Sequence, residues 1–341
     1  MQPLVGGGHE GVQCGQRRAA DGVGQVHRPT VSPPAPRGKT GGRTGGAPGA
    51  HRGRTGVRGG RGRAGYRRHD DERADGPALV RRLRPGRGSG STRPVLVLLH
   101  AFPLDSTTFD RVLPHLAAAV RVVRVDLPGL GRSVDQAVGE PSVEAMARAV
   151  LRALDDAGVE RAAVHGVSTG GYVALALADL APERVTALLL SSTTPWVGAP
   201  DLPADRLAVA GELERRGDTE PVADAVEGGL GETARADQPD LVRLVAGIVR
   251  AADPHGVAWV ARALAARADT SAVLAGFAGP VLLLYGEEDT EVPAGTVEQM
   301  AALRPASLVT TVEVLPRTGH LLALERPAEA ARAMLDLVVG A

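Results

Sequence analysis

The chain has 341 residues, and its formal net charge is zero because 39 Lys and Arg balance 39 Asp and Glu. This length suffices for one large domain or two ordinary ones. The single cysteine, Cys14, excludes an intramolecular disulfide, and no apolar run reaches the roughly 20 residues that a membrane-spanning helix needs. The first residues lack a positively charged start and an apolar core. We therefore expect a cytoplasmic protein without a secretory signal or a membrane partner.

The balanced charge conceals an uneven distribution along the chain. Residues 1–76 contain 13 Arg and one Lys but only six Asp and Glu, so this segment is basic and the remainder is acidic. Its tracts of Gly, Arg and Pro offer nothing to a hydrophobic core, which predicts a disordered arm. Tyr66 is its single aromatic residue, so base stacking gives little support to a nucleic-acid partner. A cleaved targeting segment would need an amphipathic helix, and we expect a solvated extension instead.

Residues 77–341 alternate between apolar strands and helices. Strands are predicted over residues 78–83, 95–99, 121–125, 162–164, 187–190, 281–285 and 307–315. Helices are predicted over residues 107–119, 143–157, 172–180, 297–303 and 328–339. The strand over residues 95–99 is continuously apolar, which is typical of a central strand buried on both faces. The alternation predicts an α/β fold whose mostly parallel sheet has helices on both faces.

One interval interrupts the alternation. Residues 195–275 contain helical patterns, such as 241–250 and 257–268, but no convincing strand. Because this interval lies between two predicted strands, we expect a helical cap over the carboxyl edge of the sheet. The predicted organisation is therefore an arm over residues 1–76 and one domain over residues 77–341 with an inserted cap.

A serine flanked by glycines follows the strand predicted over residues 162–164. Gly166 and Gly170 stand two residues before and two after Ser168, and a helical pattern follows. A serine on so tight a turn projects its hydroxyl out of the sheet, and glycines let strand and helix approach closely. Glycine is common in this chain, with 44 copies, so the partners of Ser168 decide whether it is a nucleophile.

Those partners stand where predicted strands end, at the sheet edge where open parallel sheets bind ligands. Asp289 follows the strand over residues 281–285, and His320 follows the strand over residues 307–315. A serine nucleophile needs a base to take its proton and an acid to orient that base. Ser168, Asp289 and His320 occur in the chain order Ser, Asp, His that one hydrolase fold uses. We predict these three as nucleophile, acid and base.

Other side chains compete for these roles. Glu287, Glu288 and Glu291 surround Asp289, and a charged surface loop would also explain all four carboxylates. The Gly-x-x-Asp spacing favours Asp289. We interpret His100 and His165 as structural histidines that are hydrogen-bonded near the site.

Five motifs in register resemble those of the α/β-hydrolase family, in its capped form that acts on small substrates. They are Leu99–Pro103, Asp126–Ser133, the segment around Ser168, Gly286–Pro293, and Thr318–His320 with Glu325 and Pro327 behind it. The match covers residues 77–341. Ala101, Leu130 and Val167 depart from the residues that the family commonly has. The resemblance implies an oxyanion hole formed by the backbone N–H groups of Phe102 and Thr169.

The resemblance and the residues together predict a serine hydrolase of small carboxylic esters or lactones. The family's haloalkane dehalogenases and epoxide hydrolases attack with an aspartate where this chain has Ser168. No metal-ligand spacing and no dinucleotide fingerprint is present, so we expect no metal and no cofactor. Trp196 and Trp259 are predicted to line the substrate pocket. Alternatives are carbon–carbon bond hydrolysis, cofactor-free perhydrolysis, or a ligand-binding receptor without turnover, and no feature fixes the oligomeric state.

Overall fold

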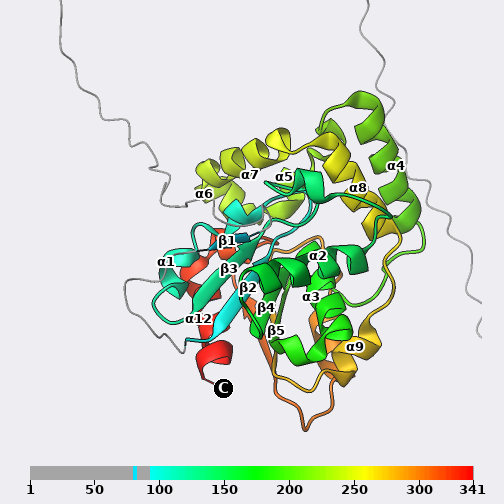
Figure 1. The fold of residues 1–341 in the computed structure, drawn as a ribbon. Coiled ribbons are helices and arrows are strands. Elements are labelled where there is room, and N and C mark those ends of the chain that lie inside the picture. The colour runs from blue at the N-terminus through cyan, green and yellow to red at the C-terminus, as the bar shows by residue number, and fades with distance from the viewer. Residues whose placement is uncertain (1–79, 83–92, 341) are drawn as a thin grey trace, which may run out of the picture. The chain divides into compact units, whose positions relative to one another are not determined.

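A seven-stranded sheet organises the part of the chain that the structure describes (Figure 1). The structure is a computed structural model, and it describes residues 80–82 and 93–340, which belong to one unit. The arm predicted over residues 1–76 lies outside the described residues. The strands are β1 (Val80–Arg82), β2 (Val95–Leu99), β3 (Arg121–Val125), β4 (Ala162–Val167), β5 (Val185–Ser191), β6 (Val281–Gly286) and β7 (Thr310–Leu315).

The strand order is β1-β3-β2-β4-β5-β6-β7, and every neighbouring pair is parallel except β1 and β3. The predicted α/β fold with a mostly parallel sheet is therefore confirmed. Because six strands run the same way, their carboxyl ends meet at one edge, where ligands of such sheets bind. The central strands are buried on both faces, as the apolar run of β2 predicts: Leu96 to Leu99 are all 0% exposed.

Helices cover both faces of this sheet. Figure 1 shows α2 (Val143–Asp156) and α3 (Thr169–Leu180) on one side and α1 (Leu113–Leu116) and α12 (Pro327–Val339) on the other. The remaining helices of the body are η1 (Ser106–Phe109), η2 (Val134–Gln136), η3 (Pro182–Arg184), α10 (Thr296–Leu303) and α11 (Leu322–Glu325). Ser142 caps α2: its Oγ accepts a 3.0 Å hydrogen bond from the N–H of Ala145.

The prediction of a single helix over residues 107–119 is wrong, because the structure has two short helices there, η1 and α1. Asp105 begins η1 by accepting a 2.8 Å hydrogen bond from the N–H of Thr107. Pro114 lies in the first turn of α1. Because proline has no N–H, it cannot donate the hydrogen bond that would continue the preceding helix into α1. The apolar spacing in the sequence was compatible with both arrangements.

Between β5 and β6 the described chain is helical, and we call residues 202–276 the cap. Its helices are α4 (Leu202–Arg216), η4 (Glu220–Val222), α5 (Ala225–Gly229), α6 (Glu232–Asp237), α7 (Pro239–Ala251), α8 (Pro254–Ala265) and α9 (Ser271–Gly276). The start of α8 touches the body closely, since a Cβ on Gly256 would lie 2.0 Å from the carbonyl oxygen of Gly129. Within residues 80–82 and 93–340, no helix is both long and apolar enough to cross a membrane.

Replacing Gly170 by alanine should destabilise the fold. The new Cβ would lie 2.2 Å from the carbonyl oxygen of Leu99 in the buried strand β2, so backbone must shift. We expect a loss of about 1–3 kcal/mol in the free energy of unfolding, measured by urea denaturation. Gly211→Ala is the matched control: it lies in the helix interior of α4 with nothing within 4 Å of its Cβ. This variant should gain about 0.5–1 kcal/mol, and equal effects at both sites would contradict the packing argument.

Candidate active site

Ser168 occupies the turn between β4 and α3 in a strained backbone conformation. Its φ of 51° and ψ of −114° fall where non-glycine residues are uncommon. The surrounding chain holds it there: its N–H donates to the carbonyl of Ser191 at 2.9 Å, and its carbonyl accepts from Thr193 Oγ1 at 2.8 Å. The backbone of Ser168 is thereby fixed at the carboxyl edge of the sheet.

The glycines around Ser168 are required by close packing. A Cβ on Gly166 would lie 2.2 Å from the carbonyl oxygen of Gly170, so β4 and α3 touch through backbone alone. Gly171 is similarly confined, since a Cβ there would lie 2.5 Å from a side-chain carbon of Thr193. The Gly-x-Ser-x-Gly spacing therefore reflects a steric constraint of this turn.

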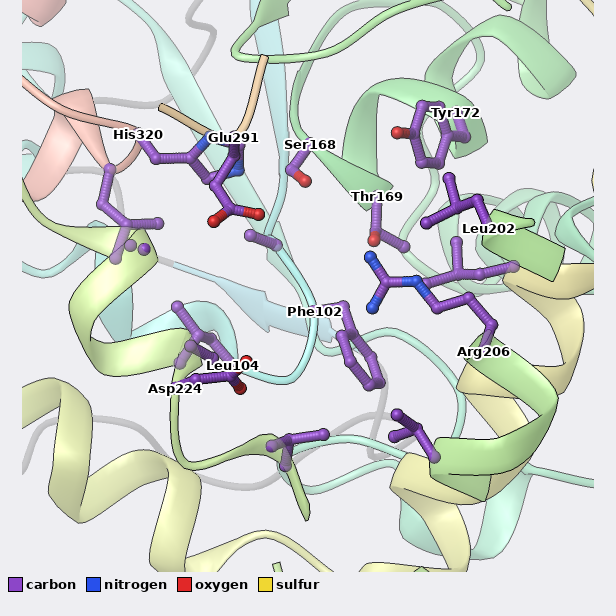
Figure 2. A pocket seen from close by; sticks show the side chains of 18 of the residues that line it. Phe102, Leu104, Ser168, Thr169, Tyr172, Leu202, Arg206, Asp224, Glu291 and His320 are labelled. Atoms are coloured by element: carbon purple, nitrogen blue, oxygen red, sulfur yellow. The ribbon is translucent and has the colours of Figure 1, made fainter. Parts of the chain in front are cut away.

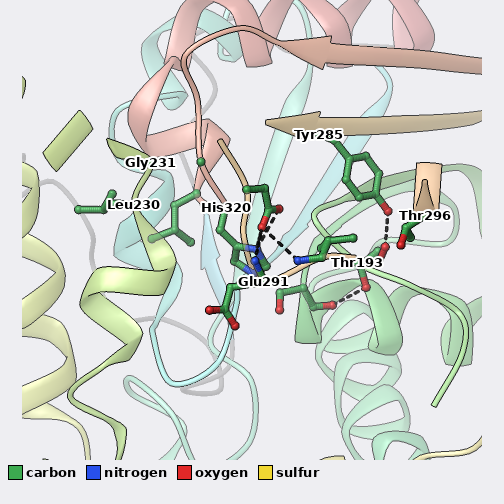
Figure 3. Close-up of polar contacts among 12 residues, drawn as sticks. Thr193, Leu230, Gly231, Tyr285, Glu291, Thr296 and His320 are labelled. Carbon is green, nitrogen blue, oxygen red and sulfur yellow. Dashed lines mark hydrogen bonds and ion pairs between the residues drawn. The ribbon is translucent and has the colours of Figure 1, made fainter. Parts of the chain in front are cut away.

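His320 and Asp289 form a hydrogen-bonded pair next to the turn. Nδ1 of His320 lies 3.0 Å from both carboxylate oxygens of Asp289. The two side chains are 9% and 2% exposed. Because Nδ1–H donates to the carboxylate, Nε2 of the neutral ring carries the free lone pair. Figure 3 shows the contacts around His320, with Glu291 beside it.

Asp289 is held as a carboxylate. Burial acts to raise its pKa, but the hydrogen bond and charge of His320 and the N–H of Glu291 act against it. The net effect lowers the pKa of Asp289 below its ordinary value of 3.8. Its Oδ1 accepts from the N–H groups of Glu291 at 3.0 Å and Val292 at 3.3 Å. An ionised carboxylate in this position stabilises a protonated His320 ring.

The other carboxylates of this loop, which the sequence left as alternatives to Asp289, make different contacts. Glu287 accepts a 3.0 Å hydrogen bond from the N–H of Arg317 at the exposed surface. Glu288 accepts from the N–H of Thr233 in the cap at 2.8 Å. Glu291 lines a cavity above the turn. Asp289 is thus the carboxylate of this loop that reaches His320.

A cavity of about 220 Å³ lies between the turn and the cap (Figure 2). Ser168 and His320 both line it, together with Phe102 and Thr169. The structure shows no hydrogen bond between the Ser168 hydroxyl and His320, and such bonds are often long until substrate is bound. The predicted nucleophile, base and oxyanion residues thus share one cavity wall.

The two predicted oxyanion residues present free backbone donors within the described chain. Neither the N–H of Phe102 nor that of Thr169 donates to another described residue. Thr169 is the first residue of α3, where the helix dipole adds partial positive charge. The arrangement can stabilise negative charge that develops on a carbonyl oxygen near Ser168.

The two tryptophans predicted to line the pocket lie elsewhere. Neither Trp196 nor Trp259 is among the residues lining the cavity. Trp259 points its indole N–H at the carbonyl of Gly139, 3.2 Å away, and Trp196 packs against the hydrophobic core. Trp259 is absent from the cavity because the orientation of α8 places it against a loop of the body.

The histidines interpreted as structural are fully buried and hydrogen-bonded. His100 accepts from the N–H of Leu127 at 2.9 Å and donates to the carbonyl of Ala101 at 3.0 Å, so both ring nitrogens are used. His165 lies 2.8 Å from the hydroxyl of Ser191, and burial lowers the pKa of His165 to about 3. A ring with so low a pKa stays neutral at physiological pH.

Glu325 holds the loop of His320 in place, a role that sequence reasoning did not assign. Its carboxylate accepts from the N–H groups of Gly319 at 2.9 Å, Leu321 at 3.1 Å and Gly231 at 3.1 Å. Burial raises the pKa of Glu325, against these three hydrogen bonds, which lower it. The bond to Gly231 also ties the cap to the loop that carries His320.

Sequence reasoning also missed the charged residues of the cavity. Arg206 and Arg267 line it from the cap, and Asp224 and Glu291 line it as well. No spacing in the sequence marks two arginines among the 39 Lys and Arg of the chain. Within the described residues, no group of three or more His, Cys, Asp or Glu side chains is arranged to hold a metal ion.

Comparison with known proteins agrees with this architecture. A family model for the alpha/beta hydrolase fold matches residues 94–327. Pimeloyl-(acyl-carrier protein) methyl ester esterase of Photobacterium profundum is 30% identical, over 74% of this chain and 96% of that protein. The biotin biosynthesis bifunctional protein BioHC of Cellvibrio japonicus is 29% identical over 72% of this chain, and the match spans 47% of that longer protein.

A solved structure shows the same fold. A thermophilic esterase from Thermogutta terrifontis, with malate bound, superposes with a TM-score of 0.68 and 30% identity, over 74% of this chain and 91% of that one. The family match, the esterase relatives and the shared fold lead to one conclusion. The chain belongs to the alpha/beta hydrolase fold family and is a hydrolase of esterase type.

Proposed function

We propose that the protein hydrolyses a small carboxylic ester or lactone through an acyl-enzyme on Ser168. The observation that carries this proposal is the hydrogen bond of His320 Nδ1 to both oxygens of Asp289, at 3.0 Å. It leaves Nε2 of His320 free on a ring that shares a cavity with Ser168. A base oriented in this way can accept the hydroxyl proton of a serine.

The first half of the reaction forms the acyl-enzyme. Ser168 Oγ attacks the carbonyl carbon of the ester while Nε2 of His320 takes its proton, and Asp289 stabilises the resulting imidazolium. The backbone N–H groups of Phe102 and Thr169 hold the oxyanion of the tetrahedral intermediate, an effect worth about 3–4 kcal/mol per donor in comparable enzymes. The intermediate collapses when the bond to the alcohol oxygen breaks, and His320 returns the proton to that oxygen.

The second half regenerates the enzyme. Water attacks the acyl carbon, His320 takes a proton from it, and the bond to Ser168 Oγ breaks with return of that proton to the serine. The products are the carboxylic acid and the free enzyme. The cavity of about 220 Å³ supports small substrates, because pockets for drug-sized ligands measure about 300–1,000 Å³.

Replacing the nucleophile should abolish covalent labelling and turnover. We expect wild-type protein to react with a fluorophosphonate probe and to hydrolyse p-nitrophenyl acetate. Ser168→Ala should lose the label, and its kcat should fall by about 10⁴-fold or more. The exposed Ser307→Ala is the matched control and should keep both. Unlabelled wild-type protein, or a label that survives in Ser168→Ala, would contradict the proposal.

Replacing Asp289 should weaken His320 as a base while the His320 ring itself stays in place. Asp289→Asn replaces an acceptor of the Nδ1–H bond by an amide, which no longer stabilises protonated His320. We expect kcat to fall by about 10³–10⁴-fold in steady-state hydrolysis of p-nitrophenyl acetate. Glu287→Gln, in the same loop but exposed, should stay within twofold of wild type. Equal losses in the two variants would assign the effect to the loop and remove the acid role.

Asp289 should also make folding stability depend on pH. The folded state lowers its pKa below the ordinary value of 3.8, so the folded state binds this proton more weakly than the unfolded state does. The stabilisation is present above about pH 4 and is lost as pH falls through the lower, folded pKa. Urea unfolding at several pH values should show wild-type stability falling faster than that of Asp289→Asn in this acidic window. If the stabilities of the two proteins fall in parallel with pH, the lowered pKa of Asp289 is contradicted.

A further inference from the structure

Two arginines of the cavity have no carboxylate partner. Arg206 comes from α4 and Arg267 from the segment between α8 and α9. Within the described chain neither forms an ion pair. Other arginines of the cap do pair with carboxylates of the same segment: Arg215, Arg216, Arg243 and Arg262. Arg235 and Arg250 of the cap also form no ion pair within the described chain, but neither lines the cavity. Arg206 and Arg267 are therefore the cap arginines that combine an unpaired charge with a place in the cavity wall.

Arg206 presents an unused guanidinium to the cavity. Its Cζ lies over the ring of Phe102, 5.6 Å from the ring centroid. Its five N–H donors make no hydrogen bond to any described residue. Figure 2 shows the guanidinium pointing into the cavity near Thr169, across from His320. Planar guanidinium groups bind carboxylates through two parallel N–H donors.

Arg267 adds a second positive charge in a fixed position. Its Cζ lies 4.1 Å from the ring centroid of Tyr172, and its guanidinium donates to the carbonyls of Trp196 at 2.5 Å and Val197 at 2.7 Å. Arg267 is 8% exposed. A buried cation satisfied only by neutral carbonyl groups leaves a positive potential in the cavity.

The acidic residues of the cavity lie at its other side. In Figure 2, Glu291 stands beside His320, Asp224 stands beside Leu104, and both are separated from Arg206 by the centre of the cavity. The cavity is thus polarised, with negative charge near the base and positive charge near Thr169. A substrate anion is attracted to the Arg206 end and repelled from the end of His320.

We propose that the substrate carries a carboxylate on its acyl part, which Arg206 binds while Ser168 attacks the ester carbonyl. The substrate class is the half-ester of a short dicarboxylic acid, or a lactone bearing a carboxylate. Arg267 supports the binding through its charge and through its contact with Tyr172. This inference rests on the proposed hydrolase function for its reaction and on the unpaired arginines for its ligand.

The test compares two methyl esters that differ in one charge. Monomethyl glutarate carries a carboxylate where methyl pentanoate ends in a methyl group, and methanol release measures kcat/KM for each. We expect wild-type protein to prefer monomethyl glutarate by tenfold or more. Arg206→Ala should lower that preference at least tenfold, and Arg206→Lys should restore part of it through charge alone. The exposed, paired Arg243→Ala should keep the wild-type preference.

A binding measurement separates this inference from the hydrolase proposal. Isothermal titration of Ser168→Ala protein with monomethyl glutarate needs no turnover, and removal of Arg206 in that background should weaken binding at least tenfold. If wild-type protein takes no fluorophosphonate label but this binding is seen, the hydrolase proposal fails and the carboxylate site stands. An absent or Arg206-independent binding, or a wild-type preference for the neutral ester, overturns the carboxylate site.

Discussion

The contact between the backbones of β4 and α3 is the constraint on which the site depends. Gly166 and Gly170 meet without side chains, and Gly170 also lies against Leu99 of β2. Strands β2 and β4 are both buried, so close packing prevents either backbone from shifting away from this contact. The unfavourable backbone of Ser168 is therefore maintained by the packed core and not by its own loop.

The parallel sheet then brings distant parts of the chain to one edge. Ser168 follows β4, Asp289 follows β6 and His320 follows β7, and these strands end together because they run in the same direction. The body carries the residues proposed for catalysis, whereas the cap carries both arginines of the cavity. The residues proposed for catalysis and Arg206 of the proposed carboxylate site thus lie on separate stretches of the chain.

The fold was predictable, and Ser168, Asp289 and His320 could be named as candidates, because both depend on local patterns. Continuous apolar runs identify buried strands. Gly166 and Gly170 mark a tight turn, because a side chain at either position would collide with backbone. The cavity was not predictable, because it depends on how helices of the cap face the body. Trp259 was expected at the cavity, but α8 turns it toward Gly139. Arg206 lies in the cavity with nothing in its sequence context to distinguish it from the paired arginines nearby.

Glu325 joins two parts of the molecule that a moving cap would have to separate. One carboxylate receives the N–H of Gly231 in the cap and those of Gly319 and Leu321 on either side of His320. Displacing this end of the cap would withdraw a hydrogen bond from the support of the base itself. Helix α4, in contrast, packs mainly on α8 and η4 of the cap. A change in α4 therefore bears on other helices of the cap, whereas a change at Gly231 bears on the loop that carries His320.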